Sequence, residues 1–485
     1  MPRVLRLLPA CAALGVLACA DRASEPEAPR PPHVVLVVID TLRADALGFG
    51  GSPHGSPHLD RLADESVVFT QAIAPSTWTL PSVASLLTSL HPSEIGLFGG
   101  AREDEHLART LADEHLTLAE VFRDHGYRTV GVVNQVFLTA KRGFGQGYDR
   151  YEILPTRADG YRLNRRLERS LATFEVAPRS GNPTGAREAS RVAPLFIHVH
   201  YFDPHWPYRY RSAEDREDLP TSLGAADRDL DPPRGGDQAT HWMVAHGEGE
   251  PRRQALETLA ARYALEVRWV DGVIAGLIDL LQGQGIWDDA VLVVTADHGE
   301  GFWEHQRLLH GHSPHEEQIH VPLLVRPPPA LAFESGARSS PVSLVDLMPT
   351  LLDLAALPIP AHCRGRSLVP AMRGEEDGTA AVLVETGGER ALRTRNGKLI
   401  VRGAGGRIGR DSDTEAGVSI EYYDLVADPG ERRNLASPCV GPCGDSLRRL
   451  LEIERRLERP AHQATSVEVS PEELEQLRSL GYVGD

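Results

Sequence analysis

The segment His33-Val34-Val35-Leu36-Val37-Val38-Ile39-Asp40 decides the fold. From Val34 to Ile39 it is continuously apolar and rich in β-branched residues, which is typical of a β-strand buried on both faces. A strand of this kind belongs to the interior of a sheet that has helices on either side. The run stops at Asp40, so we expect a carboxylate at the carboxyl end of a central strand.

Two further apolar runs have the same form. Ala290–Ala296 is followed by Asp297-His298-Gly299-Glu300, and Pro194–Phe202 is followed by Asp203-Pro204-His205. Longer segments separate these runs, and one of them, Pro251–Leu281, repeats apolar residues at helical spacing. This alternation predicts an α/β fold with a mostly parallel central sheet flanked by helices.

The three runs deliver acidic side chains to one edge of the predicted sheet. In open α/β sheets, ligands bind at the carboxyl ends of the strands, where loops and helix N-termini meet. A single Asp after a strand is also a common turn or helix-cap residue. Three such positions with nearby histidines offer the oxygen and nitrogen donors that hold divalent cations, so the sequence predicts a metal site at this edge.

A hydroxyl group near the start of a predicted helix is the candidate nucleophile. In Thr79-Leu80-Pro81-Ser82 the proline suits the first helical position, so we expect the helix to begin at Pro81. Thr79 would then lie at the positive end of the helix dipole, where backbone N–H groups bind anions and stabilise an alkoxide. The alternative is that Thr79 is only a capping residue and Ser82 an exposed hydroxyl of the first turn.

Ordered motifs along nearly the whole chain resemble the sulfatase family of the alkaline phosphatase superfamily. Together they are far more specific than any one of them. The matching segments are Asp40-Thr41-Leu42-Arg43-Ala44-Asp45, Ser56–Ala63, Thr79–Ser82 with Ala84–Thr88, Asp297–Glu300, Val321–Leu324, Asp346–Leu351, Gly365–Leu368, Tyr423–Leu425, Asp428–Glu431 and Asn434-Leu435. The resemblance implies an alkaline-phosphatase-like α/β fold.

The resemblance also implies a cofactor. It assigns Asp40, Asp297 and His298 to a divalent metal ion, with Thr79 at the position of the nucleophile and beside the same ion. Carboxylate and imidazole donors are compatible with Ca²⁺, Mn²⁺, Zn²⁺ or Mg²⁺. The predicted cofactor is therefore one divalent ion of this group, or two.

Histidines form a second cluster of predicted site residues. His205 resembles the family's histidine that contacts the sulfuryl or phosphoryl group, and His310 and His312 lie where the family places a cationic group near the leaving oxygen. One interpretation makes these side chains proton donors and anion clamps. In the other, Asp203, His205 and one of the pair bind a second metal ion, as in two-metal phosphodiesterases of the superfamily.

Departures from the family pattern bear on the chemistry. Typical sulfatases carry Cys or Ser at the nucleophile position, followed by x-Pro-x-Arg, and oxidise it to formylglycine. Here the residue is Thr79, whose methyl group sits on the carbon that would become the aldehyde, so formylglycine cannot form. Val83 replaces the motif arginine, and Thr41 replaces the second aspartate of the usual pair. A metal-activated threonine alkoxide remains, as in related nucleotide pyrophosphatases and phosphodiesterases.

Three functions stay open on these residues. The first is a metal-dependent hydrolase of phosphate or phosphonate esters. The second is a sulfate-ester hydrolase, or a group transferase, that uses the threonine directly. The third is a non-catalytic lipoprotein that binds anionic glycans or lipids. The expected partner is a small-molecule, glycan or lipid-derived sulfate or phosphate ester.

The charge and cysteine content exclude other classes. The 485 residues include 51 Lys and Arg against 68 Asp and Glu, a formal charge of −17, so the chain lacks the basic surface that binds nucleic acid. Five cysteines are too few for a disulfide scaffold. In an exported chain we expect Cys439 and Cys443 to pair, and Cys363 to stay free.

The N-terminal segment predicts export. Arg3 and Arg6 precede an apolar stretch of signal-peptide length, and Val16-Leu17-Ala18-Cys19 looks like a bacterial lipobox. We expect residues 1–19 to be a lipoprotein signal, with membrane contact only through the lipid on Cys19, in the periplasm or at the outer membrane. Plain cleavage near Ala18 or Ala20 is the alternative.

The remaining chain divides by composition. Residues 20–32, rich in Glu, Pro and Ala, predict a linker. Residues 33–371 predict the catalytic domain, in which polar residues 209–253 form an insertion or lid that selects the substrate. Residues 372–485, with short alternating strands and closing helices, predict a small antiparallel α+β subdomain.

Overall fold

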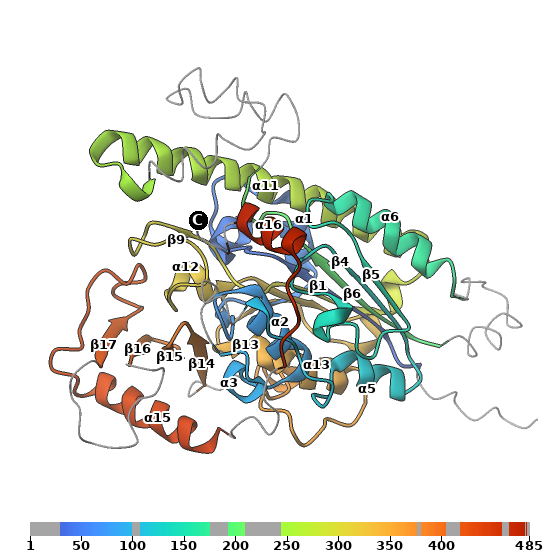
Figure 1. Cartoon of the computed structure of the whole chain (residues 1–485). Coiled ribbons are helices and arrows are strands. Elements are labelled where there is room, and N and C mark those ends of the chain that lie inside the picture. The colour runs from blue at the N-terminus through green and yellow to red at the C-terminus, as the bar shows by residue number, and fades with distance from the viewer. Residues whose placement is uncertain are drawn as a thin grey trace, which may run out of the picture. The chain divides into compact units, whose positions relative to one another are not determined.

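An eight-stranded sheet lies at the centre of the computed structural model (Figure 1). The structure describes residues 30–98, 107–174, 193–208, 244–375, 380–403, 418–457, 465–480 and 482. The predicted signal and lipid anchor, and most of the linker and insertion, lie outside these residues. Pro32–Asp485 form one compact unit. Within the described part, no helix has both the length and the apolarity needed to cross a membrane.

The sheet has the order β12-β2-β11-β7-β1-β6-β4-β5. Its strands are β1 His33–Ile39, β2 Val67–Phe69, β4 Arg128–Val133, β5 Arg150–Ile153, β6 Leu195–Tyr201, β7 Ala290–Ala296, β11 Leu323–Arg326 and β12 Gly336–Arg338. Strand β1 pairs in parallel with β6 and β7, and β4 pairs in parallel with β5 and β6. Only β11 runs antiparallel to its neighbours β7 and β2. The predicted mostly parallel sheet is confirmed.

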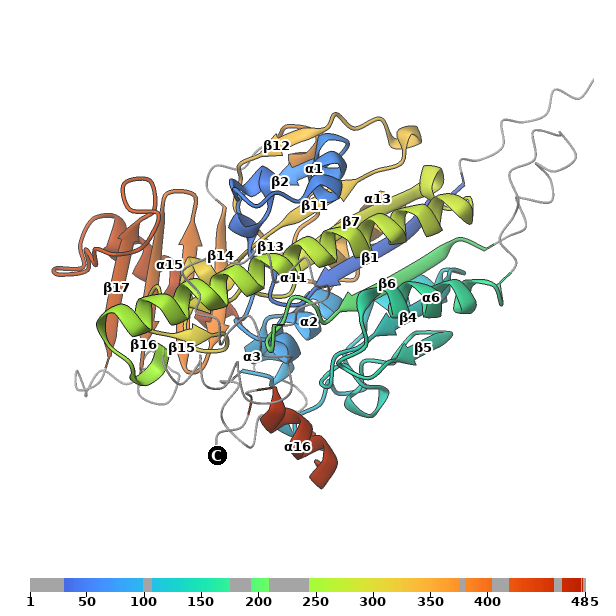
Figure 2. The same cartoon turned by 90° about the horizontal axis from the view of Figure 1, so that it is seen from above.

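Helices cover both faces of the sheet (Figures 1 and 2). On one face lie α1 Pro57–Asp64, α6 Gly160–Leu171 and α11 Gly249–Gly283; on the other lie α2 Thr79–Thr88, α5 Leu118–Asp124 and α13 Leu347–Leu354. Side chains of α11 at helical spacing, among them Leu259, Val270 and Ile274, enter the core as predicted. Because β1 is covered on both sides, Val34 to Ile39 are completely buried.

Shorter elements complete this part of the fold. The helices are α3 Pro92–Ile95, α12 Glu316–Ile319 and α14 Val369–Met372. A three-stranded sheet has the order β10-β3-β13, from β3 Ala72–Ile73, β10 His320–Val321 and β13 Val342–Ser343. A two-stranded hairpin joins β8 Gly301–Phe302 to β9 Leu308–Leu309.

The C-terminal region contains the predicted antiparallel sheet. Its four strands are β14 Ala381–Thr386, β15 Glu389–Thr394, β16 Gly397–Arg402 and β17 Ser419–Asp424, and α15 Pro442–Arg456 packs against them. Cys439 and Cys443 form the expected disulfide, and Cys363 is free. The last helix, α16 Pro471–Ser479, instead contacts the α/β part, where Glu473 pairs with Arg142 at 2.5 Å.

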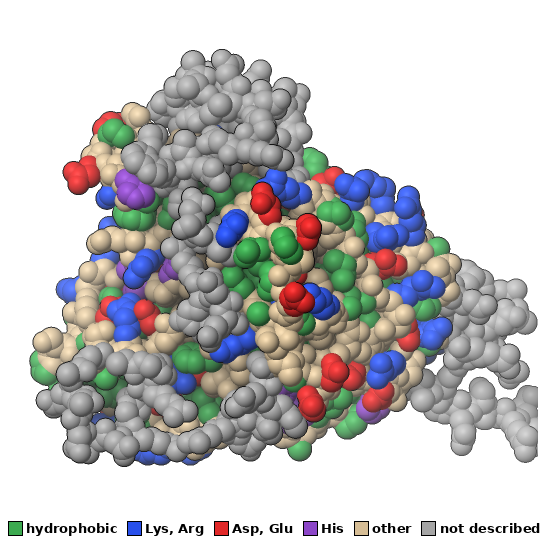
Figure 3. Space-filling view, viewed as in Figure 1, with side chains coloured by type: hydrophobic (Ala, Val, Ile, Leu, Met, Phe, Trp, Pro, Cys, Tyr) green, Lys and Arg blue, Asp and Glu red, His purple; other side chains and the backbone are tan. Residues whose placement is uncertain are grey.

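A buried ion cluster joins the C-terminal sheet to α12. Lys398 of β16 is fully buried, and its Nζ lies 2.6 Å from Glu431 Oε1 and 3.1 Å from Glu316 Oε1. On the outer surface drawn in Figure 3, Lys and Arg side chains are interspersed with Asp and Glu. The cluster therefore links the C-terminal sheet to α12 through specific ion pairs.

Candidate active site

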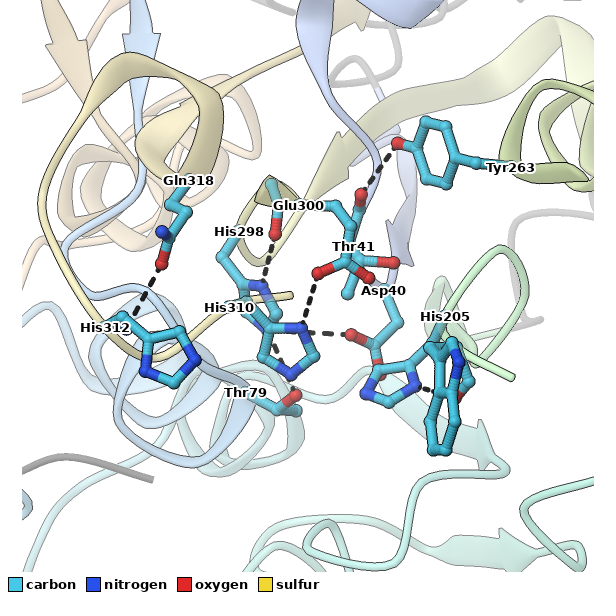
Figure 4. Close-up of polar contacts among 12 residues, drawn as sticks. Asp40, Thr41, Thr79, His205, Tyr263, His298, Glu300, His310, His312 and Gln318 are labelled. Carbon is cyan, nitrogen blue, oxygen red and sulfur yellow. Dashed lines mark hydrogen bonds and ion pairs between the residues drawn. The ribbon is translucent and has the colours of Figure 1, made fainter. Parts of the chain in front are cut away.

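Three buried side chains meet where β1 and β7 end (Figure 4). Asp40 follows β1, and Asp297 and His298 follow β7, which pairs in parallel with β1. His298 Nε2 lies 3.6 Å from Asp40 Oδ1 and 3.6 Å from Asp297 Oδ2. Within the described residues these donor atoms lie close enough together to hold one metal ion. Residues 257 positions apart are brought together because both strands end at the same edge.

The hydrogen bonding of the two carboxylates fits a cation between them. Asp40 Oδ2 accepts a bond from Gln135 Nε2 at 2.6 Å, and Asp297 Oδ1 accepts from the amides of His298 at 2.9 Å and Thr41 at 3.3 Å. The other oxygens, Asp40 Oδ1 and Asp297 Oδ2, are buried and have no hydrogen-bond partner. An unpartnered buried carboxylate oxygen is costly unless a cation or donor meets it.

His298 is oriented as a metal ligand. Its Nδ1 lies 3.0 Å from the Gly299 carbonyl oxygen, which can only accept, so Nδ1 carries the proton. The lone pair is then on Nε2, which faces Asp40 and Asp297. A second hydrogen bond that fixes the tautomer in this way is typical of metal-binding histidines. Burial and the charge of Asp297 raise the pKa of Asp40 well above its usual value, and a divalent cation would offset both effects.

Thr79 is the first residue of α2 and faces this cluster. Its Oγ1 lies 3.3 Å from His298 Nε2 and 3.4 Å from Gln135 Nε2. Trp78, not Thr79, occupies the N-cap position, so the capping interpretation of Thr79 is not what the structure shows. Ser82 is not the exposed hydroxyl of that interpretation either: it is fully buried and donates to the Asp297 carbonyl oxygen at 2.5 Å. That bond links α2 to the loop that carries Asp297 and His298.

The helix begins two residues before the predicted start. We expected Pro81 at the first helical position, but α2 starts at Thr79. Proline is tolerated there because the first N–H groups of a helix have no intrahelical acceptor. As a result, Thr79 lies within the first turn, near the positive end of the helix dipole.

Both ring nitrogens of His205 are engaged. Nδ1 bonds to the carbonyl oxygen of Trp206, and Nε2 lies 2.7 Å from the hydroxyl of Tyr482. Burial, reinforced by nearby His310, lowers the pKa of His205 to about 3, so the ring is neutral at pH 7. Asp203 is also buried, but neither it nor His205 belongs to a described group of residues whose donor atoms converge as metal ligands do.

Of the two histidines expected near the leaving oxygen, the structure brings His310 to the site. Its ring lies 4.5 Å from that of His298 and 4.8 Å from that of His205. Its Nδ1 is 2.9 Å from Glu300 Oε1, and burial raises the pKa of Glu300 to about 7. His312 lies beside Gln318, to one side of the group around Thr79 (Figure 4), and its amide donates to Gln318 Oε1 at 3.2 Å.

A second group of close donor atoms consists of His305, His315 and Glu317. The two imidazole rings are stacked, with centroids 3.6 Å apart and planes within 10° of parallel. A metal ion binds in the plane of an imidazole, so one ion cannot lie in both planes. His305 Nδ1 lies 2.9 Å from Glu317 Oε1 and Nε2 lies 3.2 Å from the Glu431 carbonyl oxygen, which is the bonding of a doubly protonated ring. We interpret this group as an ion pair.

Comparison with known proteins identifies the family. The sequence profile described as Sulfatase matches residues 32–357. The chain belongs to the sulfatase family. This sulfatase-family hydrolase is 25% identical over 454 residues to the ulvan-active sulfatase of Formosa agariphila, covering 87% of this chain and 80% of that protein.

Solved structures agree on the fold. The sulfatase-family hydrolase superposes on the phosphonate monoester hydrolase of Agrobacterium radiobacter with a TM-score of 0.62 and 21% identity, covering 91% of this chain and 98% of that one. A protein in complex with its substrate D-glucosamine-2-N,6-O-disulfate gives a TM-score of 0.64 at 18% identity, covering 93% and 98%. At such low sequence identities, the structural similarity shows only that the fold is shared.

Three site residues of this sulfatase-family hydrolase were missed by reasoning from the sequence. Gln135 is the second residue after the apolar strand β4, which ends at Val133, so a search for polar residues at strand ends could have found it. Glu300 stood in a matching motif, but no role was assigned to it. Tyr482, near the C-terminus, gave no local signal and enters the site only through the tertiary fold.

Proposed function

We propose that this chain is a metal-dependent hydrolase of singly charged esters, with Thr79 as nucleophile and phosphonate monoesters or phosphodiesters as preferred substrates. One observation carries the proposal: the Thr79 hydroxyl lies 3.3 Å from His298 Nε2, which itself faces the unpartnered oxygens of Asp40 and Asp297. A buried hydroxyl beside converging metal ligands is the arrangement that nucleophilic catalysis by an alcohol requires.

The reaction would proceed in two displacements. A divalent cation held by Asp40, Asp297, His298 and Thr79 would supply Lewis acidity for the developing negative charge. The Thr79 hydroxyl would lose its proton to water. Its Oγ1 attacks the phosphorus or sulfur atom and the bond to the leaving alkoxide breaks, which leaves an ester on the threonine. His310, held by Glu300 at 2.9 Å, gives a proton to the departing oxygen. Water then cleaves the threonine ester and restores the hydroxyl.

The charge of the site supports a singly charged substrate. Among the residues that the structure describes, those around Thr79 contribute carboxylates, imidazoles, an amide and a phenol. The nearby Arg43 is held by Asp45 at 2.7 Å and Glu304 at 2.6 Å. Two ionised aspartates balance one divalent cation, so a buried dianion would add uncompensated charge. Phosphonate monoesters, phosphodiesters and sulfate monoesters carry one negative charge, whereas a phosphate monoester carries two.

Sulfate monoesters are the second candidate. They match the charge argument, and several relatives, such as the ulvan-active sulfatase, are named as sulfatases. Phosphorus esters rank first because Thr79 cannot supply the formylglycine on which typical sulfatases depend.

The test is a panel of four 4-nitrophenyl substrates: phenylphosphonate, bis-phosphate, sulfate and phosphate. Each is assayed after chelation and after reloading with Mn²⁺, Zn²⁺, Ca²⁺ or Mg²⁺. We expect turnover only with metal, and the slowest turnover with the phosphate dianion. Thr79→Ala should lose activity by roughly 10³-fold or more, whereas Thr79→Ser, which keeps the hydroxyl, should retain most of it.

Ser85→Ala is the matched control. Ser85 is a fully buried residue of the same helix, and its hydroxyl has no hydrogen-bond partner, so its removal should leave turnover near the wild-type level. Equal turnover by Thr79→Ala would remove Thr79 from the mechanism. A preference for the phosphate dianion would refute the charge argument, and no turnover of any ester would leave only a binding function.

A further inference from the structure

The C-terminal segment 465–480 is bound to the catalytic part along its length. The amide of Thr110 donates to Thr465 O at 3.0 Å, and the amide of Val467 donates to Ala108 O at 2.8 Å. Further along, Arg142 pairs with Glu473 at 2.5 Å, and Arg142 is fully buried. These bonds hold the segment against residues 108–110, which precede α5, and against the loop that follows β4. In the loop that follows β5, Thr156 Oγ1 accepts a hydrogen bond from Gln476 Nε2 of α16 at 2.6 Å.

Tyr482 is the end point of this attachment. Its amide donates to Leu477 O at 3.0 Å, so the chain turns back on α16 and directs the side chain inward. The residue is only 3% exposed. Its ring packs edge-on against Phe137 at 4.8 Å and lies 5.8 Å from the ring of His310. The phenol is therefore held among the residues of the candidate active site.

The hydroxyl of Tyr482 completes the bonding of His205. The carbonyl oxygen of Trp206 can only accept, so Nδ1 of the neutral His205 ring carries the proton and Nε2 accepts. The Tyr482 hydroxyl, 2.7 Å away, is then the donor to Nε2. Because both nitrogens of His205 are used, the group that this pair presents to a substrate is the phenol oxygen.

The phenol also reaches other residues of the site. It shares hydrogen bonds with Thr79 and with Gln135. The phenol thus contacts the candidate nucleophile on one side and His205 on the other.

We propose that Tyr482 is a positioning residue for ester cleavage: its hydroxyl orients His205 and the Thr79 hydroxyl, and the C-terminal segment exists in part to place it there. This inference rests on the proposed function and deepens it, since it makes the C-terminus part of the active site. The family resemblance assigns His205 to contact the sulfuryl or phosphoryl group. In this chain the phenol of Tyr482 would make that contact.

The test is Tyr482→Phe in the full chain, which keeps the packing on Phe137 and removes only the hydroxyl. We expect kcat for the best substrate of the panel to fall roughly 10- to 100-fold, while KM changes less and Mn²⁺ binding by calorimetry is unchanged. In a His205→Gln background the same substitution should have little further effect, because the two act as one unit.

Tyr127→Phe is the matched control, since the hydroxyl of Tyr127 bonds to Pro32 O at 3.1 Å, apart from the residues around Thr79. It should leave kcat unchanged. A chain ending at Leu480 provides a second variant and should lose activity as Tyr482→Phe does. A kcat of Tyr482→Phe equal to that of the wild-type chain would overturn the inference. An increased kcat would also overturn it, because it would mean that Tyr482 blocks the active site.

Failure of the proposed function would be visible separately. If the wild-type chain hydrolyses no ester of the panel, the proposed function fails, and the role of Tyr482 is then decided by binding of orthovanadate. We expect Tyr482→Phe to weaken vanadate binding about tenfold, or 1.4 kcal/mol. Equal vanadate affinity in the two chains would overturn the inference.

Discussion

Replacing Asp297 by Asn should remove most of the stabilisation by metal without weakening the metal-free fold. The amide oxygen of Asn can accept the bonds that Asp297 Oδ1 accepts from His298 and Thr41. The amide nitrogen would replace Oδ2, which has no hydrogen-bond partner and faces His298 Nε2 at 3.6 Å. The substitution also removes a negative charge beside buried Asp40. The metal-free variant should therefore unfold at or above the wild-type temperature.

The size of the metal effect follows from mass action. A ligand at 100 times its Kd stabilises the folded state by about 2.7 kcal/mol. With an unfolding entropy of about 2.1 cal/mol/K per residue over the roughly 370 residues that the structure describes, this raises Tm by about 3.5 °C. Losing one carboxylate should weaken affinity about 100-fold, which leaves a shift of less than about 1 °C at the same metal concentration.

The assay is differential scanning calorimetry with and without Mn²⁺, Zn²⁺, Ca²⁺ and Mg²⁺. Asp271→Asn is the matched control: Asp271 is also buried, but its oxygens accept from the amides of His58 and Leu59. That variant should start from a lower Tm and keep the full shift. A full metal shift in Asp297→Asn, or none in the wild-type chain with any of the four ions, would refute the reasoning.

Three further predictions follow from other residues. Lys398→Met should lower the free energy of unfolding, measured by urea titration, by about 3–5 kcal/mol, because Glu316 and Glu431 would stay buried without the ammonium group that pairs with them. An unchanged urea midpoint would contradict this prediction. Burial raises the pKa of Glu431 to about 7, so the folded chain holds this proton more tightly than the unfolded chain, and stability should fall by roughly 1–3 kcal/mol as pH rises from about 5 to 8. Glu431→Gln should remove this decrease of stability with pH. A variant with the same pH dependence of stability as the wild-type chain would contradict the prediction. Thr41 has a φ of 57°, which is unfavourable for a β-branched residue. Thr41→Asp should therefore relieve backbone strain, add a carboxylate ligand and tighten metal binding, measured by calorimetry, roughly tenfold. Weaker binding would show that the added carboxylate does not reach the metal site.

The sequence was sufficient to predict the sheet and the edge at which the acids meet. Runs such as Val34 to Ile39 are unambiguous because a strand covered on both faces must be apolar throughout. Parallel pairing then places their carboxyl ends together, so Asp40 and Asp297 converge without knowledge of any contact. The helix start at Thr79 was misplaced by two residues because proline is compatible with more than one position of the first turn.

The hydrogen bonds of the site could not be derived in this way. His205 lies beside His310, but the partners of its two ring nitrogens, Trp206 and Tyr482, could not be predicted, and Tyr482 is 277 positions away. Helix α16 has an ordinary amphipathic sequence, and nothing local indicates that it packs on the α/β part rather than on the C-terminal sheet. Such contacts are decided by tertiary packing rather than by local propensity.

The stereochemical course at phosphorus tests the central claim, attack by Thr79, most directly. The metal-loaded full chain would hydrolyse a chiral phosphorothioate diester in water enriched in a heavy oxygen isotope, and the configuration of the product would be determined by NMR. Two in-line displacements, the first by Thr79 and the second by water, predict net retention of configuration. Net inversion would mean that water attacks the substrate in a single step, and would contradict a threonine nucleophile.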